Sequence, residues 1–258
     1  MNLELKNKNA LVCGSTQGIG RATAILLAEE GVNVTLIARN EEKLKAVLAE
    51  LPNDHQCHSY LVADFSKPHE LEKRIETTDF KFHILVNNTG GPRSGELISA
   101  TTTDLLNAFQ MHVICNQILT KAVVPFMKFE KFGRIINIIS TSVKEPIPGL
   151  GVSNTIRNAV GNWAKTLATE LAHFQITVNN VLPGFTNTSR LDEIIKIKAQ
   201  HEQSSVAEME QIMKNYVPVK RFAKPEETAA AVVFLASKQA SYINGINLPV
   251  DGGRTKSL

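Results

Sequence analysis

The stretch that decides the fold is Ala10-Leu11-Val12-Cys13-Gly14-Ser15-Thr16-Gln17-Gly18-Ile19-Gly20. A short apolar run, residues 10–13, leads into a glycine-rich turn, and residues 19–30 then repeat apolar side chains at helical spacing up to Gly31. A strand, a glycine-rich turn and a helix in this order begin a βαβ unit. Glycine lets the backbone approach a ligand closely, and a helix N-terminus offers free N–H groups to an anion. We therefore predict that residues 14–20 bind the phosphates of a nucleotide.

The rest of the chain repeats this alternation. Further short apolar runs, bounded by Gly, Asn, Asp or Pro, are typical of buried strands; they cover residues 32–38, 59–63, 83–87, 134–140, 176–182 and 246–250. Two long segments between them, residues 103–129 and 152–174, are predicted as helices. Strands that alternate with helices make right-handed crossovers and a parallel sheet covered on both faces. We predict an α/β fold in which residues 1–258 form a single Rossmann-like domain, a doubly wound sheet of about seven strands.

One irregular segment, residues 186–216, interrupts this pattern. It is polar and charged, it follows the sixth predicted strand, and residues 191–200 and 206–213 within it have helical spacing. Ligands of such sheets bind beyond the carboxyl ends of the strands. The segment is thus a candidate lid over a substrate pocket, and an excursion over the surface without a role is the alternative.

Composition excludes several classes of function. The 258 residues carry 28 Lys and Arg against 25 Asp and Glu, a net charge of +3 that is too small to indicate a nucleic-acid or membrane partner. No apolar run approaches 18 residues, and the first ten residues lack the apolar core of a secretory signal. The three cysteines have no metal-binding spacing. We predict a cytoplasmic protein with free thiols and no metal site.

The end of the second predicted strand indicates which cofactor binds. An acid there accepts hydrogen bonds from the adenosine 2′-hydroxyl, whereas an arginine suits a 2′-phosphate. The residue here is Arg39, in Ala38-Arg39-Asn40, and no acid accompanies it. A guanidinium matches phosphate geometry, so NADP (NADPH) is predicted over NAD. A solvated surface arginine is the alternative.

Several motifs in order give the chain a resemblance to the short-chain dehydrogenase/reductase family over essentially its full length, and to its 3-oxoacyl-carrier-protein reductases in particular. The cofactor loop resembles the family's T-G-x-x-x-G-x-G, with Cys13 in place of the threonine. The other matching segments are Asp64-Phe65, Asn87-Asn88-Thr89-Gly90, the strand that ends at Ser140, and Pro183-Gly184 followed by Thr188.

This resemblance implies roles for the matching residues. Asp64, with Phe65 beside it, would contact the adenine ring, and Asn87 and Gly90 would belong to the cofactor site. Pro183, Gly184 and Thr188 would contact the nicotinamide carboxamide, and Ser140 would be the catalytic serine. The resemblance also implies a homotetramer or homodimer built partly from the two long helices.

The chain departs from the family at the catalytic centre. The family's catalytic Tyr opens a Y-x-x-x-K motif about a dozen residues after the serine, where this chain has Ser153-Asn154-Thr155-Ile156-Arg157. Where the family has an Asn that helps to hold a proton-relay water, this chain has His112. Ser153 and Arg157 stand at i and i+4 and are expected on one helix face.

These departures change the expected chemistry. A serine hydroxyl is a weaker acid than a phenol beside an ammonium group, so Ser153 alone does not replace the tyrosine. Arg157 can bind the nicotinamide ribose and supply positive charge, and Ser140 can hydrogen-bond a carbonyl oxygen. His112 is the predicted alternative proton donor because an ordinary histidine pKa lies near physiological pH. Water held by the two serines and Arg157 is a second route, and a purely structural His112 is the alternative to both.

Three interpretations of function follow. In the first, the chain is an NAD(P)-dependent oxidoreductase that uses NADPH to reduce a small-molecule carbonyl to an alcohol with a modified proton-donor site. In the second, it binds nucleotide in a regulatory or scaffolding role without redox activity. In the third, the site binds an unrelated nucleotide. We predict the first, because the cofactor motifs are intact and arginine keeps the lysine's charge.

Overall fold

The computed structural model describes residues 1–76 and 80–257. Its core is one seven-stranded sheet in the order β3-β2-β1-β4-β5-β6-β7, with every neighbouring pair parallel. The strands are β1 (Asn9–Cys13), β2 (Asn33–Ala38), β3 (Ser59–Val62), β4 (Ile84–Asn87), β5 (Gly133–Ile138), β6 (Ile176–Pro183) and β7 (Asn247–Val250). The predicted α/β class and seven-stranded sheet are confirmed, with strand ends shifted by one or two residues.

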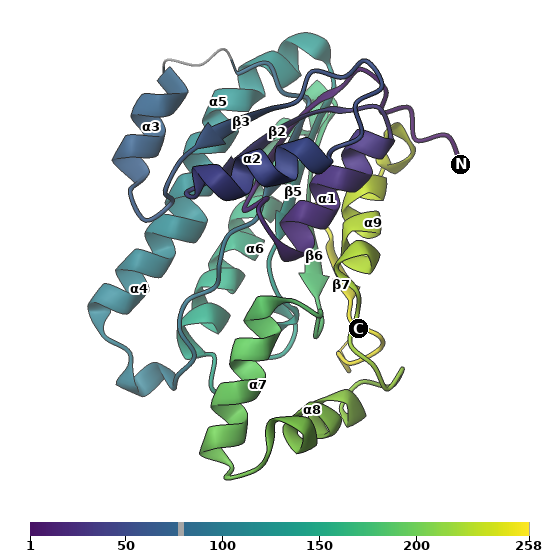
Figure 1. Ribbon diagram of the computed structural model, residues 1–258. Coiled ribbons are helices and arrows are strands. Elements are labelled where there is room, and N and C mark those ends of the chain that lie inside the picture. The colour runs from purple at the N-terminus through teal and green to yellow at the C-terminus, as the bar shows by residue number, and fades with distance from the viewer. Residues whose placement is uncertain (77–79, 258) are drawn as a thin grey trace.

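Helices cover both faces of this sheet (Figure 1). One apolar cluster packs α1 (Gly18–Glu29), α2 (Glu41–Glu50) and α9 (Pro225–Ala236) against the strands. A second cluster packs α3 (Pro68–Glu76), α5 (Cys115–Glu130) and α6 (Gly151–Leu171) against the opposite face. The central strands are therefore buried on both sides, as their almost continuous apolar sequences require.

The helical stretch predicted over residues 103–129 is confirmed, but it contains a π-helical turn that the sequence did not indicate. The structure has α4 (Thr102–Phe109), a π-helical turn (Gln110–Ile114) and then α5. A π turn inserts one residue into the helix without breaking the chain's helical course, so the apolar spacing on either side hides it. Its consequence is local, because it places His112 in the middle of the irregular turn.

A ladder of asparagine amides crosses four strands at one register. The Nδ2 of Asn87 donates to the Oδ1 of Asn137 (2.8 Å), and Asn137 donates in the same way to Asn180 (2.9 Å). Asn180 then donates to Asn247 on β7 (2.8 Å). Asn87, Asn137 and Asn180 are buried, so each amide depends on the next for its hydrogen bonds. The ladder ties the strands together just before the edge where the loops begin.

The segment after β6 forms a unit of its own. It holds α7 (Ser189–His201) and α8 (Val206–Asn215), which Figure 1 shows beyond the arrowhead of β6. Their packing is a separate small apolar cluster that includes Leu191, Ile195, Met209 and Met213. No helix in residues 1–76 and 80–257 is long and apolar enough to cross a membrane.

Candidate functional site

A cavity of about 710 Å³ lies where the carboxyl ends of the strands meet the lid segment. It is lined by loops that follow six of the strands, by α7 and by the C-terminal tail. Most of the predicted site residues line it together: Gly14, Thr16, Gln17, Gly18, Ile19, Arg39, Asp64, Phe65, Gly90, Ser140, Ser153, Arg157, Pro183, Gly184 and Thr188. Ser15, Gly20, Asn87 and His112 are not in its lining, although Ser15, Asn87 and His112 are buried beside the segments that are.

The loop after β1 is shaped to hold an anion. Gly14 and Gly18 have φ of +57° and +54°, and a Cβ on Gly14 would lie 2.7 Å from the Asn88 carbonyl oxygen. Helix α1 begins after Gln17 with no side-chain cap and no acidic residue in its first turn. Its first N–H groups are thus left for a ligand, and the helix dipole favours a negative one. The Ser15 hydroxyl is buried without a hydrogen-bond partner among the described residues. These features fit the phosphates of a dinucleotide.

Cys13 precedes this loop and is fully buried. Burial raises the pKa of its thiol far above the ordinary value, with the Asn88 backbone contact opposing the shift. The thiol therefore stays protonated at neutral pH and acts as a small apolar side chain.

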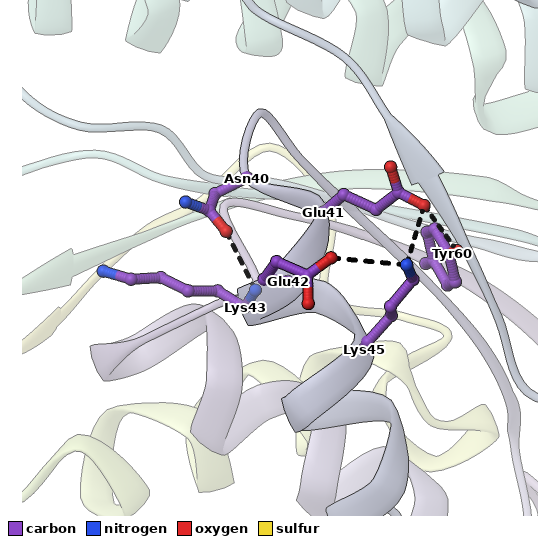
Figure 2. A network of polar contacts seen from close by, with 6 residues as sticks. All are labelled: Asn40, Glu41, Glu42, Lys43, Lys45 and Tyr60. Carbon is purple, nitrogen blue, oxygen red and sulfur yellow. Dashed lines mark hydrogen bonds and ion pairs between the residues drawn. The ribbon is translucent and has the colours of Figure 1, made fainter.

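Arg39 and Lys43 form the positive end of the cavity, next to the predicted adenosine position. Figure 2 shows why Lys43 is available: Lys45 pairs with Glu41 and Glu42, while the Lys43 side chain extends away from both carboxylates. Only the backbone N–H of Lys43 joins the network, as donor to the capping Asn40 Oδ1 at 2.9 Å.

Asp64 lies between this positive end and the rest of the cavity. Partial burial acts to raise the pKa of Asp64, but hydrogen bonds from the Ser66 N–H and hydroxyl, helped by the charge of Arg39, hold it below its ordinary value. The carboxylate is therefore ionised and able to accept further hydrogen bonds. A second hollow of about 420 Å³ adjoins it, lined in part by Arg39, Asp64 and Arg74.

Ser140, Ser153 and Arg157 lie at the other end of the cavity. Ser140 follows β5 and its Oγ accepts a hydrogen bond from the Ser142 N–H at 3.1 Å, which fixes the side chain while leaving its own proton free to donate. Arg157 is buried and donates from Nη1 to the Ile138 carbonyl at 3.1 Å. Burial, and then the charge of Arg190, lower the pKa of Arg157 to about 10, so its guanidinium remains charged at neutral pH.

His112 lies behind Gly90, inside the π turn, and is 2% exposed. Burial, and then the charge of Arg157, lower the pKa of His112 well below its ordinary value, while a hydrogen bond with the Gly90 backbone works in the opposite direction. The ring is therefore neutral at pH 7, which corrects the argument that its pKa suits proton donation. Its Nε2 is buried and has no partner among the described residues.

Three cations in the cavity lining were missed by the sequence reasoning: Lys43, Arg190 and Arg254. The sequence could have indicated Lys43, because it lies in the first turn of α2, four residues after Arg39. Arg190 donates to the Pro92 carbonyl at 2.7 Å and so joins α7 to the loop after β4. Arg254 donates to the Thr141 Oγ1 at 3.1 Å. The last two contacts join segments about a hundred residues apart, which no local pattern indicates.

Comparison with known proteins agrees with this geometry. A family profile described as Enoyl-(Acyl carrier protein) reductase matches residues 14–255. The chain belongs to the short-chain dehydrogenase/reductase family. Among its relatives is the NADPH-dependent reductase BacG of Bacillus subtilis (strain 168), 30% identical over 98% of this chain and 100% of that protein. Another is the human dehydrogenase/reductase SDR family member 4, 32% identical over 98% of this chain and 90% of that protein.

Solved structures of the family share the whole fold. L-sorbose reductase from Gluconobacter frateurii, in complex with NADPH and L-sorbose, has a TM-score of 0.92 at 29% identity, with both chains fully covered. The structure of YwfH, described as an NADPH dependent reductase involved in bacilysin biosynthesis, has a TM-score of 0.89 at 30% identity over 98% of this chain and all of that one.

Proposed function

We propose that this short-chain dehydrogenase/reductase uses NADPH to reduce a small-molecule carbonyl to an alcohol. One observation carries the proposal: one cavity extends from the uncapped start of α1 and the cations Arg39 and Lys43 to Ser140 and Arg157. The names of BacG and of the sorbose reductase complex support NADPH as the reductant and a carbonyl as the acceptor.

The cofactor would lie across the carboxyl edge of the sheet, in one orientation. Its diphosphate fits the N–H groups of residues 14–20, and its 2′-phosphate fits Arg39 with Lys43. Asp64 and Phe65 would face the adenine. Gly90, Pro183, Gly184 and Thr188 line the cavity toward Ser140 and would hold the nicotinamide half. Asn87, which is buried in the amide ladder, would act through the position of the Asn88–Gly90 loop.

At the reacting end, this chain's residues stabilise charge. When bound, NADPH supplies a hydride to the carbonyl carbon, and the carbonyl oxygen gains negative charge. The Ser140 hydroxyl is placed to donate to that oxygen, and the buried cation of Arg157 lowers the energy of the developing alkoxide. Arg157 keeps its positive charge at neutral pH, and its Nη1 is held by the Ile138 carbonyl, so we assign it to charge stabilisation and not to proton transfer.

The proton would come from water rather than from a side chain. Ser153 lines the cavity on the same face of α6 as Arg157 and can orient a water beside the carbonyl oxygen. The neutral ring of His112, with its unpartnered Nε2, is suited to hold a second water from behind Gly90. His112 is thus proposed as a positioning residue, not as the donor itself.

We also propose that residues 186–216 act as a lid. Arg190, in the first turn of α7, already bridges to Pro92 across the mouth of the cavity. The separate apolar cluster of α7 and α8 lets this unit move without disrupting the packing of the sheet.

Self-association through the long helices is proposed as well, as a homotetramer or homodimer. Large apolar side chains on α4 and α5 are exposed, namely Leu106 (62%), Phe109 (39%) and Phe129 (82%). Burying them against a second copy would remove apolar surface from water. Light scattering on the purified protein checks the mass, and a monomer at micromolar concentration would contradict this part of the proposal. Free Cys13, Cys57 and Cys115 support a reducing, cytoplasmic setting.

The activity test is NADPH oxidation with a panel of ketones, aldehydes and 3-oxoacyl thioesters. We expect turnover of at least one class, a large loss of kcat in Ser140→Ala, and a smaller loss in Ser153→Ala. His112→Ala should lower kcat without changing the pH at which the rate is half-maximal, because the ring is neutral throughout. Tight NADPH binding without turnover of any carbonyl would instead favour the regulatory or scaffolding role.

A further inference from the structure

Positively charged side chains outnumber negatively charged ones in the cavity lining. Among the described residues, Asp64 is the one acidic side chain in the lining, and it lies beside Arg39 at the proposed adenosine end. The opposite end holds three arginines, Arg157, Arg190 and Arg254. Arg157 has the family lysine's place at the nicotinamide ribose, and Arg190 is held by Glu193 and Pro92. Arg254 is the cation whose charge the proposed cofactor site does not use.

Arg254 is held beside the catalytic serine. Its Nη1 donates to the hydroxyl of Thr141, the residue that follows Ser140, at 3.1 Å. Its guanidinium carbon lies 4.5 Å from the centre of the Phe185 ring, so the plane of the group has an aromatic support. Both neighbours keep the guanidinium at the edge of the cavity near the reacting carbonyl.

The nearby carboxylates do not neutralise Arg254. Asp251 accepts hydrogen bonds from the N–H groups of Gly253 and Thr255, and Glu145 accepts those of Lys256 and Ser257. Among the described residues neither acid lies within ion-pair distance of the guanidinium, and burial lowers the pKa of Arg254 despite their charges. The two acids thus fix the tail that carries Arg254, and leave its remaining N–H groups for another acceptor.

Apolar side chains share the cavity lining with Arg254, namely Ile147, Leu150, Phe185 and Ile194, and Phe185 contacts its guanidinium. A ligand that fits here has an apolar body and one anionic group. Because Thr141 is adjacent to Ser140, the anionic group would lie within a few bonds of the carbonyl.

We infer that the substrate is an oxo acid, a ketone or aldehyde with a carboxylate that Arg254 binds. This inference rests on the proposed carbonyl reduction and names the substrate class of that site. A planar guanidinium binds a carboxylate through two parallel hydrogen bonds, which both anchors the substrate and orients its carbonyl toward Ser140.

The test compares oxo acids of graded length, beginning with 4-oxopentanoate, with their methyl esters at saturating NADPH. Each pair has the same carbonyl and differs in charge. We expect a higher kcat/KM for at least one acid than for its ester. Arg254→Gln should lower kcat/KM for that acid by about tenfold to a hundredfold and leave the ester within about twofold. Arg254→Lys should restore part of the loss, and Lys196→Gln, an exposed cation on α7, should change neither substrate.

A binding arm separates this inference from the proposed function. Pentanoate, pentyl phosphate and pentanol are titrated into the NADPH complex of wild type and of Arg254→Gln. Binding of pentanoate that Arg254→Gln abolishes supports the anion site even if no carbonyl is reduced, in which case the reductase proposal alone fails. Preference for pentyl phosphate over pentanoate would overturn the carboxylate assignment. Equal kinetics of acid and ester, or an equal loss for both in Arg254→Gln with unchanged NADPH affinity, would overturn the inference itself.

Discussion

At the scale of single residues, the proposed site has cations for the cofactor at one end, and Ser140, Ser153 and Arg157 at the other. Lys43 forms no ion pair among the described residues and Arg39 has only the charge of Asp64 nearby, whereas Lys45 pairs with both Glu41 and Glu42. At the other end, Ser153 and Arg157 place a hydroxyl and a buried positive charge in the cavity lining. In the proposed mechanism these residues would stabilise the alkoxide, and water would deliver the proton.

The preference for NADPH over NADH should depend on the positive charge of Arg39, with Lys43 beside it. In Arg39→Gln the dissociation constant for NADPH should rise about tenfold or more, because a charge-assisted hydrogen bond to phosphate is lost. NADH affinity should hardly change. Fluorescence titration of both cofactors measures the difference, and Lys45→Gln, on the helix α2 that follows Arg39, is the control. Parallel weakening of NADPH and NADH would mean that Arg39 has no part in reading the 2′-phosphate.

His112 should make the protein less stable in acid. Its pKa in the folded state lies below the ordinary value of 6.5, so the unfolded chain takes up the proton first as pH falls. The contribution of His112 to the free energy of unfolding is therefore fully present above pH 6.5 and is lost as the pH falls below that value. Denaturant unfolding between neutral pH and about pH 5 should show this slope, and His112→Asn should flatten it. His83, whose pKa is lowered by burial, leaves a residual slope of the same sign. An unchanged slope in His112→Asn would show that the ring is not held neutral.

At the scale of elements, the strand–turn–helix at the start of the chain was predicted nearly to the residue, because glycine spacing and apolar periodicity are local properties. The π turn between α4 and α5 was not predicted, because it leaves that periodicity almost unchanged. The contacts of Arg190 and Arg254 were likewise beyond prediction, since they join segments that only the finished fold brings together.

The asparagine ladder should contribute strongly to stability. Asn137→Ala removes a donor and an acceptor in a buried site, so the Nδ2 of Asn87 loses its acceptor and the Oδ1 of Asn180 loses its donor. The free energy of unfolding should fall by about 2–5 kcal/mol. Asn247→Ala at the half-buried end of the ladder is the control and should cost about 1 kcal/mol. Equal losses in the two variants, measured by urea unfolding, would contradict the dependence on burial.

At the scale of the whole molecule, the sheet order brings the loops after β1, β4, β5 and β6 to one edge, with the lid beyond it (Figure 1). This is the arrangement in which open α/β sheets bind their ligands. The cavity is lined by the glycine-rich loop, by Arg39 and Lys43, and by Ser140 with Arg157, and in the proposed function it would hold the cofactor and the substrate along one path. The proposed reaction in this cavity is hydride transfer to a carbonyl carbon beside Ser140.

The most direct test of that claim is isotope transfer. The protein is incubated with NADPH deuterated at the reactive position of the nicotinamide and with the oxo acid panel, and the products are analysed by mass spectrometry and NMR. We expect deuterium on the carbinol carbon, on one face only, and a rate that Ser140→Ala lowers by about a hundredfold or more. Tight NADPH binding with no deuterium in any product, or deuterium delivered to a carbon other than the carbonyl carbon, would contradict the account.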